Sequence, residues 1–154
     1  KTISLDPDGS GIFHFLQTGE YKASVGGSFT EGIGIMRLVD NFRQANVDFA
    51  LNLPDKDIVT VAEYVRKNDA LVLGSSSALN VAGALFSAIQ FGPLSGGDKQ
   101  SVVTLACDLG ERSSSKLYNP EFLASKSIDP SEQSIEQLVE KYKNAKNTGI
   151  DAIS

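Results

Sequence analysis

Strand-like and helix-like hydrophobic patterns alternate along the chain. Between two apolar runs, apolar residues recur at positions i, i+3, i+4 and i+7, and this spacing predicts a helix from Pro54 to Arg66. Alternation of this kind is typical of an α/β fold, so we expect a mostly parallel open sheet with flanking helices. Short apolar and β-branched runs predict its strands at Lys1–Leu5, Val47–Leu53, Ala70–Leu73 and Ser101–Ala106.

Two more helices are expected in the second half of this pattern. One runs from about Ala78 to Phe91, is rich in alanine, and ends at Gly92-Pro93. The other is short and opens at Asn119-Pro120, because asparagine caps helices well and proline is favoured at the first helical position. It extends to Lys126. A surface loop is predicted between the longer helix and the last strand.

The sequence after Ile128 is more polar and carries one amphipathic helix. Its apolar face consists of Ile135, Leu138, Val139 and Tyr142. We therefore divide the chain into residues 1–128, the main body, and residues 129–154, a helical tail appended to it.

Composition narrows the function classes. The 154 residues are 41% hydrophobic, which is enough for one packed domain, and no apolar run is long enough to span a membrane. The formal charge of −5 argues against a nucleic-acid partner, since phosphate binding needs a basic face. One cysteine, Cys107, and one histidine, His14, exclude a disulfide framework and a Cys/His metal site. We interpret His14 as a packed or surface imidazole and Cys107 as an inert, buried thiol.

The most informative segment is Ala70–Asn80 (ALVLGSSSALN), which reads as a buried strand, a tight turn and a helix start. Open α/β sheets bind ligands at the carboxyl ends of their strands, where a helix N-terminus favours an acceptor or an anion. Simple N-capping by one serine is the alternative interpretation. Three successive serines exceed what one cap needs, and this favours a binding site.

Five motifs in order give the chain a family resemblance. They are DPDGSG at residues 6–11, EGIG at 31–34, GSSSA at 74–78, CDLGER at 107–112 and SKLYN at 115–119. In this order and spacing the chain resembles the C-terminal half of the cysteine synthase and cystathionine β-synthase group, which are pyridoxal-phosphate enzymes of fold type II. The segments at residues 28–34 and 74–80 most resemble a eukaryotic, mitochondrial-type cysteine synthase. The resemblance therefore implies a mitochondrial or a cytoplasmic location.

The resemblance implies two cofactor-binding residues. Ser76 matches the serine that hydrogen-bonds the pyridine nitrogen of pyridoxal 5′-phosphate, and Gly32 matches a loop near the cofactor. A neutral hydroxyl leaves the ring nitrogen largely unprotonated, which favours β-replacement over transamination. The implied reaction joins O-acetylserine to sulfide and gives cysteine and acetate. The chain departs from the family pattern at Ala78, where glycine is common, and at Ser113-Ser114, where a tyrosine and an apolar residue are common.

No lysine of this chain lies in the family's Schiff-base motif, and the phosphate-binding loop is also absent. We therefore assign no catalytic residue, and we expect a companion chain or an N-terminal half to supply both. The chain is then a truncated or processed half or one subunit of a split enzyme, within a homo-oligomer or a larger assembly. The sequence opens on Lys1 in a predicted strand, so we expect that any targeting segment has been removed or was never on this piece. Two alternatives stay open: cystathionine β-synthase-like or serine dehydratase-like chemistry, and a non-catalytic paralogue with a structural role. Asp108 and Arg112 either order the loop beneath the cofactor or form a local ion pair.

Overall fold

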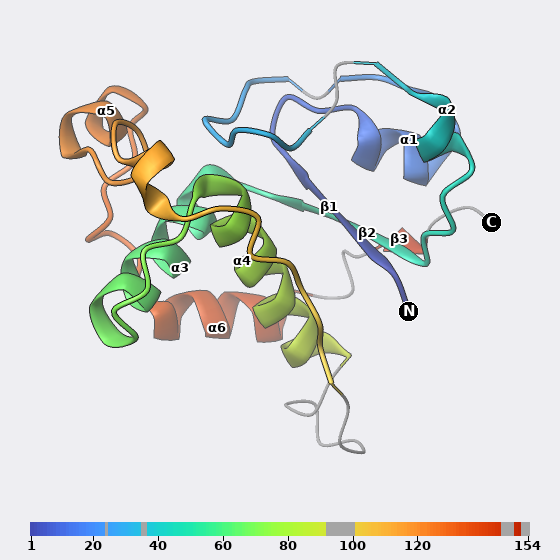
Figure 1. The fold of residues 1–154 in the computed structure, drawn as a ribbon. Coiled ribbons are helices and arrows are strands. Elements are labelled where there is room, and N and C mark those ends of the chain that lie inside the picture. Colours follow the sequence, from blue (N-terminus) through green and yellow to red (C-terminus); the bar gives the residue numbers. More distant parts are fainter. Residues whose placement is uncertain (24, 35–36, 92–100, 146–149, 152–154) are drawn as a thin grey trace.

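Three strands form one sheet in the computed structural model, which describes residues 1–23, 25–34, 37–91, 101–145 and 150–151. β1 (Ile3–Pro7) lies parallel to β2 (Phe49–Leu53), in a register that pairs the first residues of the two strands (Figure 1). β3 (Ile150–Asp151) pairs with the other edge of β2 in the antiparallel direction. The connection from β1 to β2 carries α1 (Ile12–Thr18) and α2 (Asp40–Arg43).

Helices lie on both sides of this sheet, as the α/β prediction requires. α3 (Asp55–Asn68), α4 (Ser75–Gln90) and α6 (Ile135–Asn144) pack together on one side, and α1 and α2 lie on the other (Figure 1). α4 approaches β1 so closely that a Cβ atom on Gly83 would lie 2.4 Å from Leu5 Cδ1. The predicted fold class is therefore confirmed.

Strand β2 divides the core in two because its side chains alternate between the sheet faces. Ala50 lies in a small cluster with Ile12 and Leu16 of α1. Leu51 and Leu53 point the other way, into a larger cluster that also contains residues of α3, α4 and α6. The larger cluster fixes the position of α4, the helix that begins with the three serines.

Two of the four predicted strands are confirmed and two are wrong. Ala70–Leu73 forms only one bridge, between Leu73 and Leu109, and Ser101–Ala106 is exposed and makes no ladder. A strand exists only where a neighbouring backbone satisfies its N–H and C=O groups, and among the residues that the structure describes no second strand lies beside either segment. Instead, the segment that leads into residues 108–110 runs next to residues 72–74: Gly110 N–H donates to the Val72 carbonyl at 2.8 Å. The predicted loop at residues 94–100 and the Gly92-Pro93 stop lie outside the described residues.

The predicted helices are present, with shifted ends. α3 extends two residues beyond Arg66, and α4 begins at Ser75 instead of Ala78. α5 (Pro120–Ser125) is capped as expected, since the Asn119 side chain accepts hydrogen bonds from two backbone N–H groups of its first turn. A single 3₁₀ turn precedes it at Gly110–Ser113.

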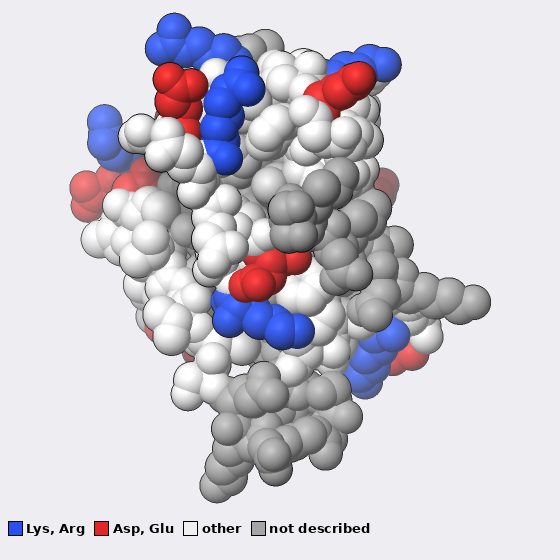
Figure 2. All heavy atoms as spheres, turned by 90° about the vertical axis from the view of Figure 1, so that its right-hand side faces the viewer, with Lys and Arg blue, Asp and Glu red and all other residues white. Residues whose placement is uncertain are grey.

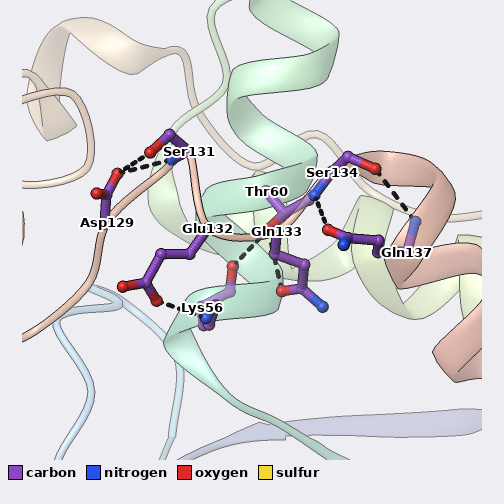
Figure 3. Close-up of polar contacts among 8 residues, drawn as sticks. All are labelled: Lys56, Thr60, Asp129, Ser131, Glu132, Gln133, Ser134 and Gln137. Atoms are coloured by element: carbon purple, nitrogen blue, oxygen red, sulfur yellow. Dashed lines mark hydrogen bonds and ion pairs between the residues drawn. The ribbon is translucent and has the colours of Figure 1, made fainter.

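The segment after Ile128 packs against the main body and shares its core, so it is not a loose appendage. Leu138 and Tyr142 of α6 are buried in the same cluster as the side chains of α3 and α4. Figure 3 shows the preceding loop tied to α3, where Lys56 pairs with Glu132 at 2.9 Å and Thr60 Oγ1 donates to Gln133. A capping box between Ser134 and Gln137 then starts α6 (Figure 3). The boundary at residue 128 stays a prediction.

Charged side chains of both signs are interspersed on the face drawn in Figure 2. Elsewhere on the molecule, ion pairs form within single helices, such as Lys143 with Glu140 on α6 and Arg66 with Glu63 on α3. Within the described part of the chain, no helix combines the length and the apolar character needed to cross a membrane.

Candidate cofactor site at the start of helix α4

The three serines lie inside the first turn of α4 rather than before it. Gly74 occupies the N-cap position with extended backbone angles. Because glycine has no side chain, the N-cap residue makes no capping hydrogen bond to the helix. The interpretation of one serine as a simple N-cap is therefore wrong. The first N–H group of the helix finds its acceptor in another segment of the chain: Ser75 N–H donates to Ser113 Oγ at 3.0 Å. Ser113 is buried, and its hydroxyl caps the helix from a segment 38 positions further along the chain.

All three serines are buried, and their hydroxyls contact two other segments of the chain, with Ser76 and Ser77 sharing Asp108. Ser75 Oγ accepts a hydrogen bond from Glu31 N–H at 3.0 Å. Ser76 Oγ donates to Asp108 Oδ1 at 3.3 Å. Ser77 Oγ donates to the Asp108 carbonyl at 2.7 Å and accepts from Asp108 N–H at 3.0 Å. The turn is thus the meeting point of the loop at residues 31–34 and the segment at residues 108–113.

Glycine is required at residue 74 because Asp108 lies against it. A Cβ atom there would be 2.0 Å from Asp108 Oδ1, far inside contact distance. Gly74 N–H also donates to the Asp108 carbonyl at 3.1 Å. The absence of a side chain therefore lets the carboxylate approach the helix N-terminus, where the helix dipole stabilises negative charge.

The predicted site residues Ser76 and Gly32 lie close to the same turn. Gly32 has a φ of +74°, which favours glycine, and the space where its Cβ atom would lie is open. The residue before it, Glu31, contacts Ser75 through its backbone and Lys116 through its side chain. The hydrogen bond and charge of Lys116 lower the pKa of the Glu31 carboxyl. This ion pair bridges the glycine loop and the segment that precedes α5.

Of the remaining sequence candidates, Cys107 and His14 make no contact with the three serines, whereas Asp108 does. Cys107 is exposed, so the prediction of a buried thiol is wrong; the strand that was to bury it is not formed. His14 Nδ1 lies 2.8 Å from the Glu20 carbonyl, at the end of α1. Asp108 contacts the serines and forms no ion pair with Arg112 or with any other described residue. Among the described residues, no group of three His, Cys, Asp or Glu side chains is arranged to hold a metal ion.

Sequence reasoning did not predict the contacts that Asp108 and Ser113 make with the serines. These contacts join residues 31 to 38 positions apart, and no local pattern encodes them. The only signal was indirect: Ser113 departs from the family pattern, and its small polar side chain suits a hydrogen bond in a narrow buried space.

Comparison with known proteins finds several cysteine synthases and an L-cysteine desulfhydrase among the relatives. No family model matches the chain. Cysteine synthase 2 of Schizosaccharomyces pombe is 36% identical over 152 residues, which cover 90% of this chain and 37% of the relative. Cysteine synthase of Dictyostelium discoideum is 35% identical over 128 residues, covering 77% of this chain and 32% of the relative. The chain therefore spans about a third of the length of these curated relatives.

A solved structure shares the fold. The O-acetylserine-dependent cystathionine β-synthase of Helicobacter pylori superposes with a TM-score of 0.56 over 74% of this chain and 33% of that one, at 24% sequence identity. The fold is thus that of a fold type II enzyme, and the sequence resemblance seen in the five motifs is confirmed. Over most of its length the chain is therefore similar to part of the cysteine synthases, a family of pyridoxal-phosphate-dependent enzymes.

Proposed function

We propose that this chain is part of a cysteine synthase-like enzyme that converts O-acetylserine and sulfide into cysteine and acetate. The observation that carries the proposal is the similarity to cysteine synthases over 90% of the chain, with Ser76 in the first turn of α4 and the Gly32 loop joined to that turn by the hydrogen bond from Glu31 N–H to Ser75. Pyridoxal phosphate, when bound, supplies the electron sink for β-replacement. The relatives' names give the reaction class, and the residues at the start of α4 suit its cofactor.

The residues present fit one side of such a cofactor. Ser76 carries a hydroxyl, which can donate to or accept from a pyridine nitrogen, in the first turn of a 16-residue helix. Gly32 leaves its backbone uncovered, so that a flat ring can approach it. In this proposal Ser76 holds the ring nitrogen, Gly32 borders the ring, and the Glu31–Lys116 pair holds the Gly32 loop in place.

A companion part of the enzyme supplies the Schiff-base lysine and the phosphate-binding loop in this proposal. Lys116, the lysine beside the candidate site, is engaged with Glu31, and Lys141 is engaged with Asp57. Exposed apolar side chains along residues 71–72 and 103–109 suit packing against such a companion. They are Leu71, Val72, Val103, Leu105 and Leu109. A homo-oligomer would also cover part of this surface.

The mitochondrion is the proposed compartment. The supporting observation is that a relative from Saccharomyces cerevisiae, 30% identical over 128 residues, carries the word mitochondrial in its name. The eukaryotic character of the motifs at residues 28–34 and 74–80 agrees with this. Fractionation of cells that express the tagged protein would test the compartment.

Reconstitution tests the function. The chain alone, mixed with pyridoxal phosphate, should not form the visible absorption band of a lysine-bound cofactor. Together with the lysine-bearing part, it should gain that band and release cysteine from O-acetylserine and sulfide. Ser76→Ala should lower turnover at least tenfold, whereas Ser114→Ala, which removes an exposed hydroxyl on the neighbouring segment, should not. If the assembled protein binds the cofactor but makes no cysteine, the structural-paralogue alternative is the better account.

A further inference from the structure

Residues 101–106 run along α4 without a strand partner. Asn80 holds them there, since its Nδ2 donates to the Leu105 carbonyl at 3.0 Å and its carbonyl accepts from Thr104 Oγ1 at 3.3 Å. Among the described residues, no backbone group of this segment bonds to another backbone group. Its apolar side chains also remain exposed, Val103 to 88% and Leu105 to 71%. A β-branched segment with open backbone groups is ready to pair with a further strand.

β1 presents a second open backbone edge. It pairs with β2 on one side, and within the described part of the chain no strand pairs with its other side. Its first half lies near the end of α4, because Ile3 pairs with Phe49 and the Phe49 ring stacks on Phe91 at a centroid distance of 5.0 Å. Further along β1, Leu5 lies against Gly83. β1 therefore runs from the end of α4 towards its start, with N–H and C=O groups exposed along its free edge.

Residues 101–106 follow the same course. Leu105 contacts Asn80 in the second turn of α4, and Asp108, further on, contacts Ser77 in the first turn. Figure 1 shows this segment running alongside α4 towards the start of that helix. The two open edges therefore point in the same direction, which is the arrangement of neighbouring strands in a parallel sheet.

A groove of about 420 Å³ lies between the two edges, lined by β1, α4 and residues 101–104. Its α4 wall is nearly flat, because Gly83 and Ala84 are small and the Ser87 hydroxyl donates to the Gly83 carbonyl at 2.7 Å. Lys1 also borders the groove, but its ammonium group lies over the Phe49 ring, 4.8 Å from the centroid. The described lining therefore suits aliphatic side chains.

We propose that this groove is a slot for one β-strand of the companion part of the enzyme, inserted between β1 and residues 101–106 and parallel to both. The proposal rests on the proposed function, in which a companion part completes the site. The inserted strand pairs with both open edges, and every second side chain enters the groove. Because a central parallel strand is covered on both faces, it is a run of apolar, β-branched residues. The Schizosaccharomyces pombe relative is long enough to hold such a strand, since this chain matches 37% of it.

A second copy of this chain fits the slot less well. β2 is flanked by β1 and β3, and β1 and residues 101–106 are each held against their own α4. A copy could insert a strand only by detaching it from its own helix. The companion strand also accounts for the sequence of residues 101–106, which has the composition of a strand and forms its ladder only in the assembly.

Proline substitutions at Val102 and Val103 test the slot. Successive residues of a strand direct their N–H groups to opposite edges, so one of the two prolines removes a hydrogen bond to the inserted strand. That variant should weaken binding of the lysine-bearing part about tenfold, the equivalent of one lost hydrogen bond. Val25→Pro, at a fully exposed valine outside the groove lining, should leave the affinity unchanged. Titration calorimetry measures the affinity, and circular dichroism checks that each variant is folded before mixing.

Hydrogen exchange and cross-linking report the inserted strand directly. Amides in residues 3–7 and 101–106 should gain protection together when the lysine-bearing part is added, and should not gain it in the chain alone. Cross-linking in a Cys107→Ser background tests the direction. Ser101→Cys should form a disulfide with a cysteine in the first half of the inserted strand, and Leu105→Cys with a cysteine in its second half.

Three results would overturn the inference while the assembly still makes cysteine. They are an unchanged affinity in both proline variants, cross-links in the reverse order, and protection that rises with the concentration of the chain alone, which would identify a second copy as the occupant. If the two parts do not assemble into an active enzyme, the proposed function itself fails.

Discussion

Removing the ammonium group of Lys141 should destabilise the fold measurably. Lys141 Nζ lies 2.8 and 2.7 Å from the two carboxylate oxygens of Asp57, and Tyr142 Oη donates to one of them at 3.2 Å. The Asp57 side chain is 2% exposed, while that of Lys141 is 49% exposed. Lys141→Met therefore leaves a buried carboxylate with the Tyr142 hydroxyl and the N-terminal end of α3 as its remaining partners.

The size of this effect follows from the burial of the pair. Breaking a fully buried ion pair costs about 3–5 kcal/mol, whereas an exposed pair contributes about 0–1 kcal/mol; a half-exposed lysine on a buried carboxylate lies between, at about 2 kcal/mol. For a chain of this size that corresponds to a melting temperature lower by about 4–8 °C. Denaturant titration followed by circular dichroism measures the loss in free energy of unfolding.

Lys143→Met is the matched control. Lys143 lies on the same helix and pairs with Glu140 at 3.7 Å, with both side chains more than half exposed. Its loss should stay within about 0.5 kcal/mol. The reasoning is refuted if Lys141→Met costs no more than Lys143→Met, or if it costs the same in an Asp57→Asn background, where no buried charge remains to be compensated.

Two further substitutions test the start of α4. Gly74→Ala places a Cβ atom 2.0 Å from Asp108 Oδ1 and should reduce the free energy of unfolding by about 1–3 kcal/mol, whereas Gly27→Ala, with no atom within 4 Å, should be neutral in the same denaturant titration; equal effects would contradict the steric argument. Lys116→Met should raise the pKa of Glu31 towards its ordinary value, because Lys116 is the main cause of its lowering. Since that pKa is lowered in the folded protein, the stabilisation is present above the ordinary pKa and is lost as the pH falls through the lowered one; an NMR titration of Glu31 that does not change would show that another group lowers its pKa.

The sequence predicted the elements whose stability is local. The apolar spacing in α3 and the Asn119 cap of α5 place those helices to within two residues, because a helix satisfies its backbone within its own segment. The apolar runs at residues 70–73 and 101–106 have the composition of strands, but neither segment forms a strand in the structure. A strand depends on a partner that its own sequence does not specify.

The candidate site was predicted only in part, because some of its contacts also depend on partners far away in the sequence. Ser76 and Gly32 stood in recognisable motifs, and the structure brings their segments together through Glu31 and Ser75. Asp108 was considered only for a loop or a local ion pair, since its contact with Ser76 spans 32 residues. Long-range hydrogen bonds of this kind depend on how helices pack, and a single sequence carries no record of that packing.

The long-range ties at the start of α4 also determine when this turn forms during folding. Its serines are held by residues 31 to 44 positions away, whereas α3 and the body of α4 are neighbours in sequence and pack directly. Contacts that close long loops form late, after local ones have compensated the loss of chain entropy. The helix pair therefore provides an early framework, and the binding turn is completed on it last. Substitutions in this turn should accordingly speed unfolding while leaving the rate of folding nearly unchanged.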